Sequence, residues 1–507
     1  MKYLIISAVI CYAITVFPIT AEAQVTDKWI RVVQQSEPID LDGCNSIDNV
    51  SGRILQQNIV ETLVQKNPKN NSLMPRLATS WKQVDPLTWE FNLRQGVTFH
   101  DGAPFNAKTA KLSLDRMMIK SLSCRDNLVK SSQSFSVLVA GPYLLRIVTS
   151  KPDPILPMRM ATTTIVSPNT SIDKLSLGAI GTGPYVFDSW RMGHQILLKR
   201  NDKYWGAKPE VEGVIFMWRS ESSVRAAMVE IGEADITTSI APQDATNPKT
   251  DISYINSETT FLRIDTTQPP LNDKRVRLAL NYALDREAIR ANIFSKDYKH
   301  ATQIVIPSIP GHNDAIDKQI RLYDPEKAKK LLAEARADGV LVDTEITLLG
   351  NQTQYPNAAD VIESAYANYK AVGLNVKLQQ LDLGRYRAYN SKPFPEGRGP
   401  TIMQKSHDNN LGDPVFSVFN RYACAGNGST VCDPALDKEI ERVTELAGVP
   451  RTRGWQGIFR TLYEDIVPDV MLYHMVGYAR VSPRIIFIPD TTTNNELRVQ
   501  EITFAKK

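Results

Sequence analysis

Residues 345–378 read EITLLGNQTQYPNAADVIESAYANYKAVGLNVKL and contain the pattern of a strand, a helix and a second strand. The apolar residues predict strands over residues 345–349 and 374–378, and helical spacing predicts a helix over residues 357–372. Gly373 is typical of the position that ends a helix. Two strands joined through a helix form a parallel pair, so this unit predicts an α/β fold.

The residues before this unit predict further helices. Asp324 and Pro325 are typical of a helix N-cap and first turn, and Gly339 is typical of the position after the last turn. After the pair Pro269–Pro270, one long helical pattern is built on Val276, Leu280, Leu284 and Ile289. The C-terminal half is therefore expected to form an α/β lobe of its own.

The N-terminal half is richer in strand patterns. Strands are predicted over residues 29–33, 89–93, 143–148, 185–187, 196–199 and 214–218. A helix is expected from Asn106 to Met118, with Asn106 as its N-cap. A second helical stretch is predicted from the spacing of Ile54, Leu55, Ile59 and Leu63. This half is expected to be a mixed, strand-rich α/β region.

Length and composition are those of a folded globular protein. The chain has 507 residues, which is enough for about three domains at roughly 150 residues each. Hydrophobic residues make up 42% and charged residues 22%, which argues against a disordered, collagen-like or coiled-coil chain. The net charge is only +4 and no basic cluster occurs, so nucleic acid is not an expected partner.

The first 23 residues have the pattern of a secretory signal peptide. Lys2 is followed by an apolar run from Tyr3 to Phe17, and Ala21-Glu22-Ala23 fits a cleavage site after Ala23. A membrane anchor is the alternative, but a run of about 15 apolar residues falls short of the roughly 20 that span a bilayer. Ile10 before Cys11 is too bulky for a lipidation site, so we expect a free periplasmic protein without a lipid anchor.

Four cysteines follow the predicted cleavage site, and an even number in an oxidising compartment favours disulfides. Cys424 and Cys432 enclose a Gly-rich loop that would let the two sulfur atoms meet. Cys44 and Cys124 are then paired by elimination, with two buried free thiols as the alternative. No C-x-x-C pair occurs, so a zinc framework is not expected.

The sequence contains no catalytic motif of the common classes. It lacks the G-x-S-x-G of a serine hydrolase, and the Gly181–Pro184 turn lacks the ending of a phosphate-binding loop. The six histidines are scattered, and none forms a close ligand pair such as H-E-x-x-H. We therefore expect a protein that is not an enzyme and that holds no cofactor or metal.

Seven short segments stand in a fixed order along almost the whole chain. They are Ser36–Asp42 (SEPIDLD), Leu77–Trp81 (LATSW), Leu93–Gly102 (LRQGVTFHDG), Gly181–Tyr185 (GTGPY), Tyr204–Pro209 (YWGAKP), Asp273–Leu280 (DKRVRLAL) and Tyr323–Ala328 (YDPEKA). Each alone is a turn or a cap. Together they resemble the periplasmic solute-binding proteins of ABC importers, in the branch that handles peptides, nickel chelates, opines and similar solutes.

The resemblance implies a two-lobe periplasmic binding protein fold of the large type II class, with a hinge and an inserted domain. The first lobe is expected over residues 24–57, 186–267 and 480–507, the insertion over 58–185, and the second lobe over 268–479. Such a protein closes around its ligand and docks on ABC permease subunits at the inner membrane. We expect a monomer that binds a small, peptide-like or other polar organic solute. A carrier of a metal chelate or haem with the same fold and a secreted hydrolase are the alternatives.

Two family positions bear on the charge of the ligand. In dipeptide- and oligopeptide-binding relatives, an Asp shortly before a Gly-Asp-Pro turn pairs with the ligand's amino group. Here the turn is Gly412–Pro414, Asn410 stands in place of that Asp, and Asp408 lies two residues earlier. Either Asp408 takes the role through a shifted loop, or the ligand has no free amino terminus there. His407 is the nearest ring where relatives have an aromatic residue.

The second position is an Arg that holds the ligand carboxylate in dipeptide-type relatives. The corresponding segment, Asn351–Tyr355, has no Arg or Lys, and Gln352, Gln354 and Tyr355 are its expected ligand contacts. Because neither position carries the charged residue of the relatives, the resemblance implies a less charged, polar or peptide-like solute. Insertions or deletions that moved these positions are the alternative.

Further ligand contacts are expected from distant parts of the sequence, because closure requires contacts with both lobes. These are Glu37, Pro38 and Ile39 in the first lobe, Tyr386 in the second lobe, and His474 and Tyr478 near the return of the chain to the first lobe. The Cys424–Cys432 bridge would hold the loop that carries Asp408 and Asn410.

Overall fold

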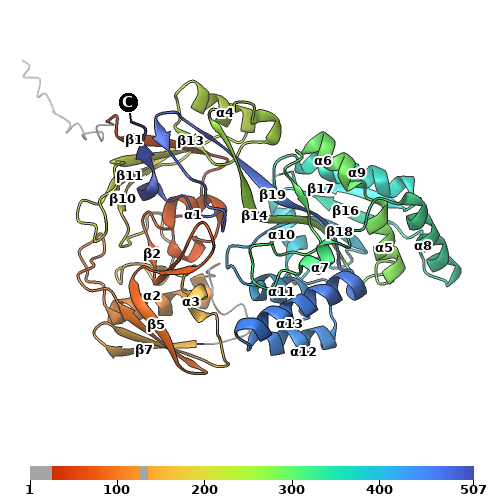
Figure 1. The fold of residues 1–507 in the computed structure, drawn as a ribbon, viewed down its shortest axis with the longest axis horizontal. Helices are drawn as coiled ribbons and strands as arrows, with labels where there is room; N and C mark the ends of the chain where they lie inside the picture. Colours follow the sequence, from red (N-terminus) through yellow and green to blue (C-terminus); the bar gives the residue numbers. More distant parts are fainter. Residues whose placement is uncertain (1–25, 123, 125–134, 353, 507) are drawn as a thin grey trace, which may run out of the picture.

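The structure is a computed structural model that describes residues 26–122, 124, 135–352 and 354–506. Within these residues an eleven-stranded sheet runs through the molecule. Along the sheet the strands are β10 (Tyr185–Arg191), β11 (Gln195–Arg200), β12 (Gly213–Trp218), β1 (Trp29–Gln34), β13 (Ile236–Thr237), β19 (Asp469–Val481), β14 (Asp251–Ile264), β18 (Thr401–Asp408), β16 (Ile346–Gly350) and β17 (Val376–Gln380), with β15 (Lys299–His300) on β19 beside this path. The two ends of the sheet lie in different lobes (Figure 1).

The first lobe is built around β1, which is parallel to β12 and to β13. Its core contains Ile30, Val32, Val214 and Phe216, all of them buried. A Cβ atom on Gly213 would lie 2.4 Å from the ring of Trp29, so this position in the β1–β12 pair requires glycine. Outside the large sheet, the elements of this lobe are α1 (Asn49–Leu55), α4 (Ser222–Glu230), β20 (Ile485–Ile486) and β21 (Thr503–Phe504).

The residues between α1 and β10 form a separate antiparallel sheet with a hydrophobic core of its own. This sheet has the order β5 (Ala78–Asp85), β6 (Thr88–Leu93), β8 (Leu144–Thr149) and β7 (Phe135–Gly141). Phe91, Leu145 and Ile147 alternate toward α2 (Ala107–Met117) and are fully buried. The smaller elements are β2 (Glu61–Thr62), β3 (Val64–Lys66), β4 (Leu73–Pro75), α3 (Leu156–Arg159) and β9 (Thr164–Ile165).

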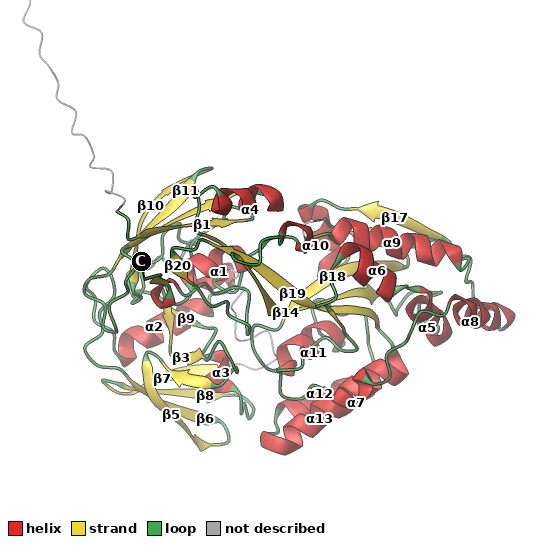
Figure 2. Cartoon of the chain, turned by 45° about the horizontal axis from the view of Figure 1, so that its top comes forward, coloured by secondary structure: helices red, strands yellow, loops and turns green. Residues whose placement is uncertain are grey.

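The second lobe has helices on both faces of the large sheet (Figure 2). Leu262 and Val470 face one core, while their neighbours Phe261 and Met471 face the other. This alternation along β14 and β19 is what a strand covered on both faces requires. The first face packs against α5 (Lys274–Ala283), α6 (Arg286–Ile293), α8 (Pro325–Ala337) and α9 (Ala358–Ala371), and the other against α11 (Pro414–Tyr422), α12 (Pro434–Thr444) and α13 (Gly448–Thr461).

The two longest strands connect the lobes. β14 and β19 pair antiparallel from Asp251 opposite Arg480 in the first lobe to Arg263 opposite Asp469 in the second. The register shifts between Ile255 and Thr259, in the middle of this pair. Figure 1 shows β14 and β19 crossing from one half of the molecule to the other. They are therefore the strands through which the large sheet passes from one lobe to the other.

Most expected elements are present. The βαβ unit is confirmed, with β16 parallel to β17 on either side of α9, and β18 is parallel to β16 on its other side. Asn106 caps α2 as expected and forms a capping box with Thr109. Gly339 and Gly373 both adopt positive φ angles, +86° and +87°, at helix ends. These successes rest on local signals: periodicity, caps and glycines.

Two helix predictions were wrong in extent. The helix with Ile54 and Leu55 ends at Leu55, and the chain then turns, although Ile59 and Leu63 are fully buried. Apolar residues that are buried in an irregular segment can therefore have the same spacing as the apolar face of a helix. The long pattern from Val276 to Ile289 is two helices, α5 and α6, because Asp285 caps a new helix after the extended residue Leu284.

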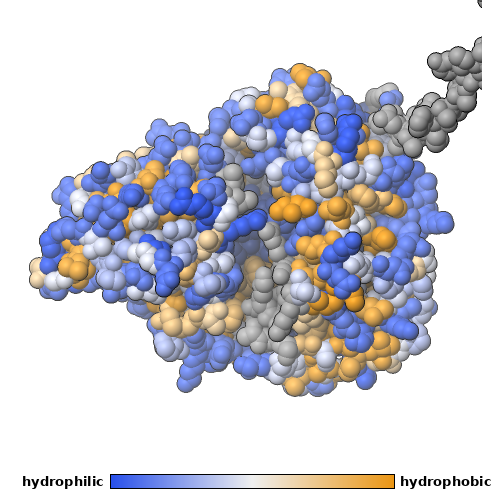
Figure 3. Space-filling model, turned by 180° about the vertical axis from the view of Figure 1, so that it is seen from behind, coloured by the Kyte–Doolittle hydropathy of each residue, from blue (hydrophilic) through white to orange (hydrophobic). Residues whose placement is uncertain are grey.

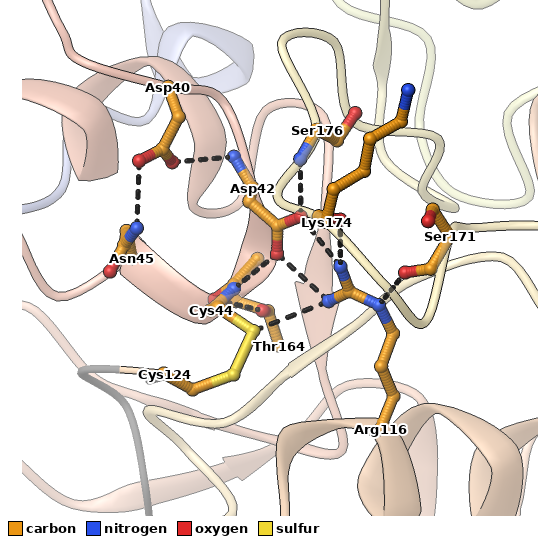
Figure 4. Close-up of a disulfide and its surroundings, with 11 residues drawn as sticks. Asp40, Asp42, Cys44, Asn45, Arg116, Cys124, Thr164, Ser171, Lys174 and Ser176 are labelled. Atoms are coloured by element: carbon orange, nitrogen blue, oxygen red, sulfur yellow. Dashed lines mark hydrogen bonds and ion pairs between the residues drawn. A yellow bond between two sulfur atoms is a disulfide. The ribbon is translucent and has the colours of Figure 1, made fainter. Parts of the chain in front are cut away.

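Both disulfides are present. Cys424 is bonded to Cys432, and Cys44 to Cys124, so the alternative of two free thiols is wrong. The Cys44–Cys124 disulfide connects the loop after β1 to the region between α1 and β10. Beside it, Arg116 of α2 donates to both carboxylate oxygens of Asp42 at 2.9 and 2.8 Å, and both side chains are buried (Figure 4). A bidentate charged pair of this kind fixes the loop in position.

The signal peptide and the boundaries of the lobes stay predictions. The predicted signal peptide and its cleavage site lie outside the described residues. The residue boundaries proposed for the two lobes and the insertion stay predictions. Among the described helices, none is long and apolar enough to cross a membrane.

Candidate functional site

A cavity of about 780 Å³ lies between the two lobes. The space-filling view from behind shows a recess between the two halves of the molecule (Figure 3). Its lining residues come from the loop after β1, from α1, from β14 and β19, from the loop after β16, and from α10 (Leu383–Asn390). Loops at the carboxyl ends of parallel strands are the usual ligand-binding positions of an open α/β sheet.

The first-lobe wall includes the loop Glu37–Asp40. The carboxylate of Glu37 accepts hydrogen bonds from Trp190 Nε1 at 2.8 Å and from the backbone nitrogen of Gly193 at 2.9 Å. Glu37 is thus held by the β10–β11 hairpin. Ile39, by contrast, is 72% exposed and offers an apolar surface to the cavity. Such a side chain suits the apolar part of a ligand.

The second-lobe wall includes Gln354 and Tyr355. Tyr355 is buried, and its hydroxyl oxygen accepts a hydrogen bond from Gln404 Nε2 at 2.8 Å. Gln354 is positioned by Tyr386, whose hydroxyl oxygen lies 2.8 Å from both Gln354 Oε1 and the carbonyl oxygen of Gln404. Tyr386 thus lies behind the wall and orients a residue that lines it.

The strands that connect the lobes also line the cavity and carry an acidic group there. Glu258 on β14 faces the cavity and lies opposite Asp408 in the β14–β18 pair. Burial, together with the negative charge of Asp408, raises the pKa of Glu258 to about 7. The charge of Arg53 opposes this shift, while Arg53 Nε donates to the carbonyl oxygen of Asn494 at 2.8 Å. Glu258 is therefore a carboxyl group whose charge is only partly compensated.

Asp408 does not line the cavity and lies behind the wall that Glu258 belongs to. Its carboxylate accepts hydrogen bonds from Ser257 Oγ and from the backbone nitrogen of Asn494. Burial raises its pKa, and these hydrogen bonds oppose the shift. Two carboxyl groups are thus adjacent on paired strands, one at the cavity and one beneath it.

The charged groups around the cavity are mostly acidic. The lining contains four carboxylic side chains, Glu37, Asp40, Asp48 and Glu258, and two cationic ones, Arg53 and Arg387. Asp40 accepts from the backbone nitrogen of Asp42 at 3.0 Å, but burial has the larger effect and raises its pKa. The cavity therefore favours a ligand that carries positive charge.

Sequence comparisons place the chain among known proteins. Residues 72–428 match the family described as "Bacterial extracellular solute-binding proteins, family 5 Middle". The chain belongs to this family. Its members are solute-binding proteins, and their description places them outside the cytoplasm.

Two relatives illustrate the similarity of this family 5 protein. The dipeptide-binding protein of Escherichia coli (strain K12) is 28% identical in an alignment of 400 residues that covers 72% of this chain and 73% of that protein. The glutathione-binding protein GsiB of Salmonella paratyphi A (strain ATCC 9150 / SARB42) is 28% identical in an alignment of 398 residues that covers 75% of each chain.

Solved structures share the fold. The dipeptide-binding protein from Pseudoalteromonas sp. SM9913 in complex with Met-Leu matches with a TM-score of 0.81 and 18% identity, over 94% of this chain and 100% of that one. NikA from Brucella suis in complex with Fe(III)-EDTA matches with a TM-score of 0.81 and 22% identity, over the same shares. The α/β, two-lobe fold expected from the sequence is confirmed.

The structure brings six of the expected ligand contacts of the family 5 protein to the cavity. They are Glu37, Pro38, Ile39, Gln354, Tyr355 and Tyr478. The hydroxyl groups of Tyr478 and Ser295 lie 2.7 Å apart. These residues come from both lobes and from β19, in agreement with the expectation that distant segments of the chain meet at the ligand site. That each of them contacts the ligand stays a prediction.

The other expected contacts do not line this cavity within the described residues. They are Gln352, Tyr386, His407, Asp408, Asn410 and His474. Gln352 is exposed, while the backbone oxygen of Asn410 accepts a hydrogen bond from Lys66 Nζ. The imidazole of His407 hydrogen-bonds Ser417 Oγ at 2.6 Å, and burial lowers its pKa well below the usual value. Their contribution to binding would have to be indirect or follow a change in the relative position of the lobes.

Several lining residues were not singled out in the sequence. Glu258, Asn256 and Tyr254 stand on a strand that carries no motif, and only its pairing with β18 and β19 places them at the cavity. Asp40 lies within the segment SEPIDLD and directly follows Ile39, so it could have been included. Asn494 comes from the C-terminal segment, where no motif pointed to a ligand contact.

Proposed function

We propose that this family 5 protein is the periplasmic binding component of an ABC importer and captures a peptide-like solute between its lobes. The supporting observation is the interlobe cavity, which is lined by residues of both lobes and of the connecting strands. A ligand that contacts both lobes favours their closure, because it adds contacts only in the closed state. In this proposal the protein acts as a monomer without catalysis and delivers its ligand to permease subunits after removal of the signal peptide.

The size and lining of the cavity support a small peptide or peptide-like compound. A volume of about 780 Å³ lies in the range of small-molecule sites. Ile39 supplies apolar contact, and Gln354 supplies an amide oriented by Tyr386. The relatives named as dipeptide-binding and glutathione-binding proteins support the same class of solute.

We assign the positively charged group of the ligand to Glu258. A buried ammonium requires a charged partner, and Asn410, at the position expected for the amino-group contact, cannot supply one. Glu258 faces the cavity instead, with Asp408 beneath it. This assignment replaces the expectation of a less charged solute, which was based only on Asn410 and on the segment Asn351–Tyr355.

The proposal is tested by identifying what the protein carries and what it binds. Small molecules released from denatured protein should include peptides when analysed by mass spectrometry, and calorimetry with a dipeptide panel should show saturable binding. A stoichiometric nickel or iron chelate, released together with its organic part, would instead support the chelate-carrier alternative. Turnover of peptides or esters that one point substitution abolishes would support the hydrolase alternative.

A further inference from the structure

A second polar cluster lies in the second lobe, where the chain enters the short helix α7 (Asp314–Asp317). His312 is 5% exposed and stands between the carboxylates of Asp314 and Asp317. One potential ligand atom from each of the three residues lies within 4.8 Å of the other two. None of the three lines the interlobe cavity, so the cluster is separate from the solute site.

The two ring nitrogens of His312 have different surroundings. Nδ1 lies 3.0 Å from Asp314 Oδ1, at hydrogen-bond distance. Nε2 is buried, has no hydrogen-bond partner, and lies 3.5 Å from Asp317 Oδ2. A carboxylate on Nδ1 holds the proton there and leaves the lone pair of Nε2 available, which is the arrangement found around metal-bound histidines.

The separation of 3.5 Å between His312 Nε2 and Asp317 Oδ2 is informative. A protonated Nε2 bonded to a carboxylate would lie at about 2.7–2.9 Å. Two ligand atoms that share a tetrahedral zinc ion at about 2.0–2.1 Å each stand roughly 3.4 Å apart. The observed distance is long for a hydrogen bond and matches that of two ligands of one metal ion.

The neighbouring contacts fix both ligand atoms. Asp317 Oδ1 accepts a hydrogen bond from Thr302 Oγ1, which leaves Oδ2 facing His312. The backbone nitrogen of Asn313 donates to Gln303 Oε1 at 3.0 Å, and Asn313 Nδ2 donates to the backbone oxygen of Gln456 in α13 at 2.8 Å. The loop is therefore held in place without a ligand, as a preformed site requires.

A second imidazole lies beside the cluster. The ring of His474 on β19 is 6.0 Å from that of His312, centroid to centroid. Its Nδ1 lies 3.0 Å from Thr259 Oγ1, whereas its Nε2 is buried and has no hydrogen-bond partner. Buried polar atoms in native proteins rarely stay unpaired unless an ion or a water molecule occupies the site. Two unpaired imidazole nitrogens therefore occur in one small region.

We propose that His312 Nε2 and Asp317 Oδ2 bind a divalent transition-metal ion such as Zn²⁺, with Asp314 orienting the imidazole. Imidazole and carboxylate are the donors that such an ion accepts, and the two carboxylates balance its charge. The ion links the loop before α7 to the last residue of that helix, and Asn313 attaches the same segment to α13. It is a resident ion of this lobe, distinct from any chelate in the interlobe cavity.

The test uses the mature protein after removal of bound solute and of metal with a chelator. Zn²⁺ alone, added in a calorimetric titration, should bind with one site per chain and raise the melting temperature. Co²⁺ should give the visible absorption of a low-symmetry site. The variants H312Q and D317N should lose saturable binding, and D314N should bind about tenfold or more weakly. H194Q, which changes an exposed histidine far from the cluster in sequence, is the matched control and should bind as the unaltered chain does.

The outcomes separate this site from the solute site. Absence of saturable Zn²⁺ binding, or equal binding by D317N and the unaltered protein, would overturn the proposal. Should H312Q fail to fold, D317N and the exposed position Asp314 keep the test decisive. The variant E258Q, altered in the interlobe cavity, should retain Zn²⁺ binding; its loss in E258Q would assign the ion to that cavity and equally overturn the proposal.

Discussion

Replacing Glu258 by Gln is expected to abolish most of the pH dependence of ligand binding. Glu258 lines the cavity, and burial together with the charge of Asp408 raises its pKa to about 7. An ammonium group of the ligand pairs with the ionised carboxylate. Binding therefore has to remove a proton from Glu258 wherever the pH lies below this pKa.

The size of the change in affinity with pH follows from the pKa of about 7 for Glu258. At pH 5.5 only about 3% of such a carboxyl group is ionised, and at pH 7.0 about half is. The amino terminus of a peptide stays largely protonated over this range, because its pKa is about 8. Affinity should thus rise roughly 16-fold from pH 5.5 to pH 7.0, which corresponds to about 1.6 kcal/mol.

The assay is calorimetry at both pH values with one histidine-free dipeptide that the protein binds and with its N-acetylated form. The unaltered protein should show the pH effect for the free peptide only. E258Q should bind the free peptide more weakly at pH 7.0 and nearly independently of pH. The exposed Glu233, changed to Gln, is the matched control. Equal affinity at both pH values, or the same pH slope in E258Q, would refute the assignment.

The same carboxyl group should affect folding with the opposite sign. A pKa of about 7 in the folded state, against 4.5 for the ordinary group, means that the folded protein binds the proton more tightly. Stability of the ligand-free protein should therefore fall as the pH rises from about 4.5 to about 7, by up to roughly 3 kcal/mol from this group. Urea unfolding of the unaltered protein and of E258Q at pH 5 and pH 8 measures this contribution. The pH dependence should be smaller in E258Q by the share of Glu258, whereas the share of Asp469, whose pKa burial also raises to about 7, should remain.

Three further changes have defined outcomes. Arg116→Met leaves the buried carboxylate of Asp42 without its partner and should lower the free energy of unfolding by about 3–5 kcal/mol in urea denaturation; a loss below about 1 kcal/mol would contradict the structure. Replacing Cys44 and Cys124 together by Ala opens a bridge between residues 80 positions apart and should cost about 4 kcal/mol in the same assay, whereas an unchanged midpoint would show that the bridge contributes nothing. Tyr386→Phe removes the hydroxyl that orients a cavity-lining glutamine and should weaken binding about two- to tenfold by calorimetry without changing the fold; unaltered affinity would remove Tyr386 from the binding machinery.

The parts of the fold that could be predicted are those with local signals. The strand–helix–strand unit of residues 345–378 was visible because its periodicity, its ending glycine and its apolar strands agree. The sequence predicts one helical stretch where α5 and α6 stand, because the apolar spacing continues through Leu284. The break between the two helices depends on the cap that Asp285 provides. Ile59 and Leu63 carried helical spacing although they are buried in irregular chain, so spacing alone did not reveal where α1 ends.

The candidate site was predictable only in part, because some of its residues are brought to the cavity by strand pairing and carry no local sequence signal. Glu37, Pro38 and Ile39 lie in a segment shared with the family, and the resemblance pointed to them. Glu258 belongs to no such segment, and its position follows from the pairing of β14 with β18 and β19, which sequence spacing does not reveal. The cluster around His312 has its residues close together in sequence, but the buried imidazole also lies beside a residue distant in sequence, His474 of β19.

The connecting strands β14 and β19 have a practical consequence for anyone who uses this protein as a fluorescent sensor. They connect the lobes and also line the cavity, so a dye attached to either strand would disturb ligand recognition and the link between the lobes together. Labels belong on surfaces remote from both strands, one on each lobe. A pair on the exposed strand β5 and on α8 would report the distance between the two sides of the molecule, because neither element lines the cavity.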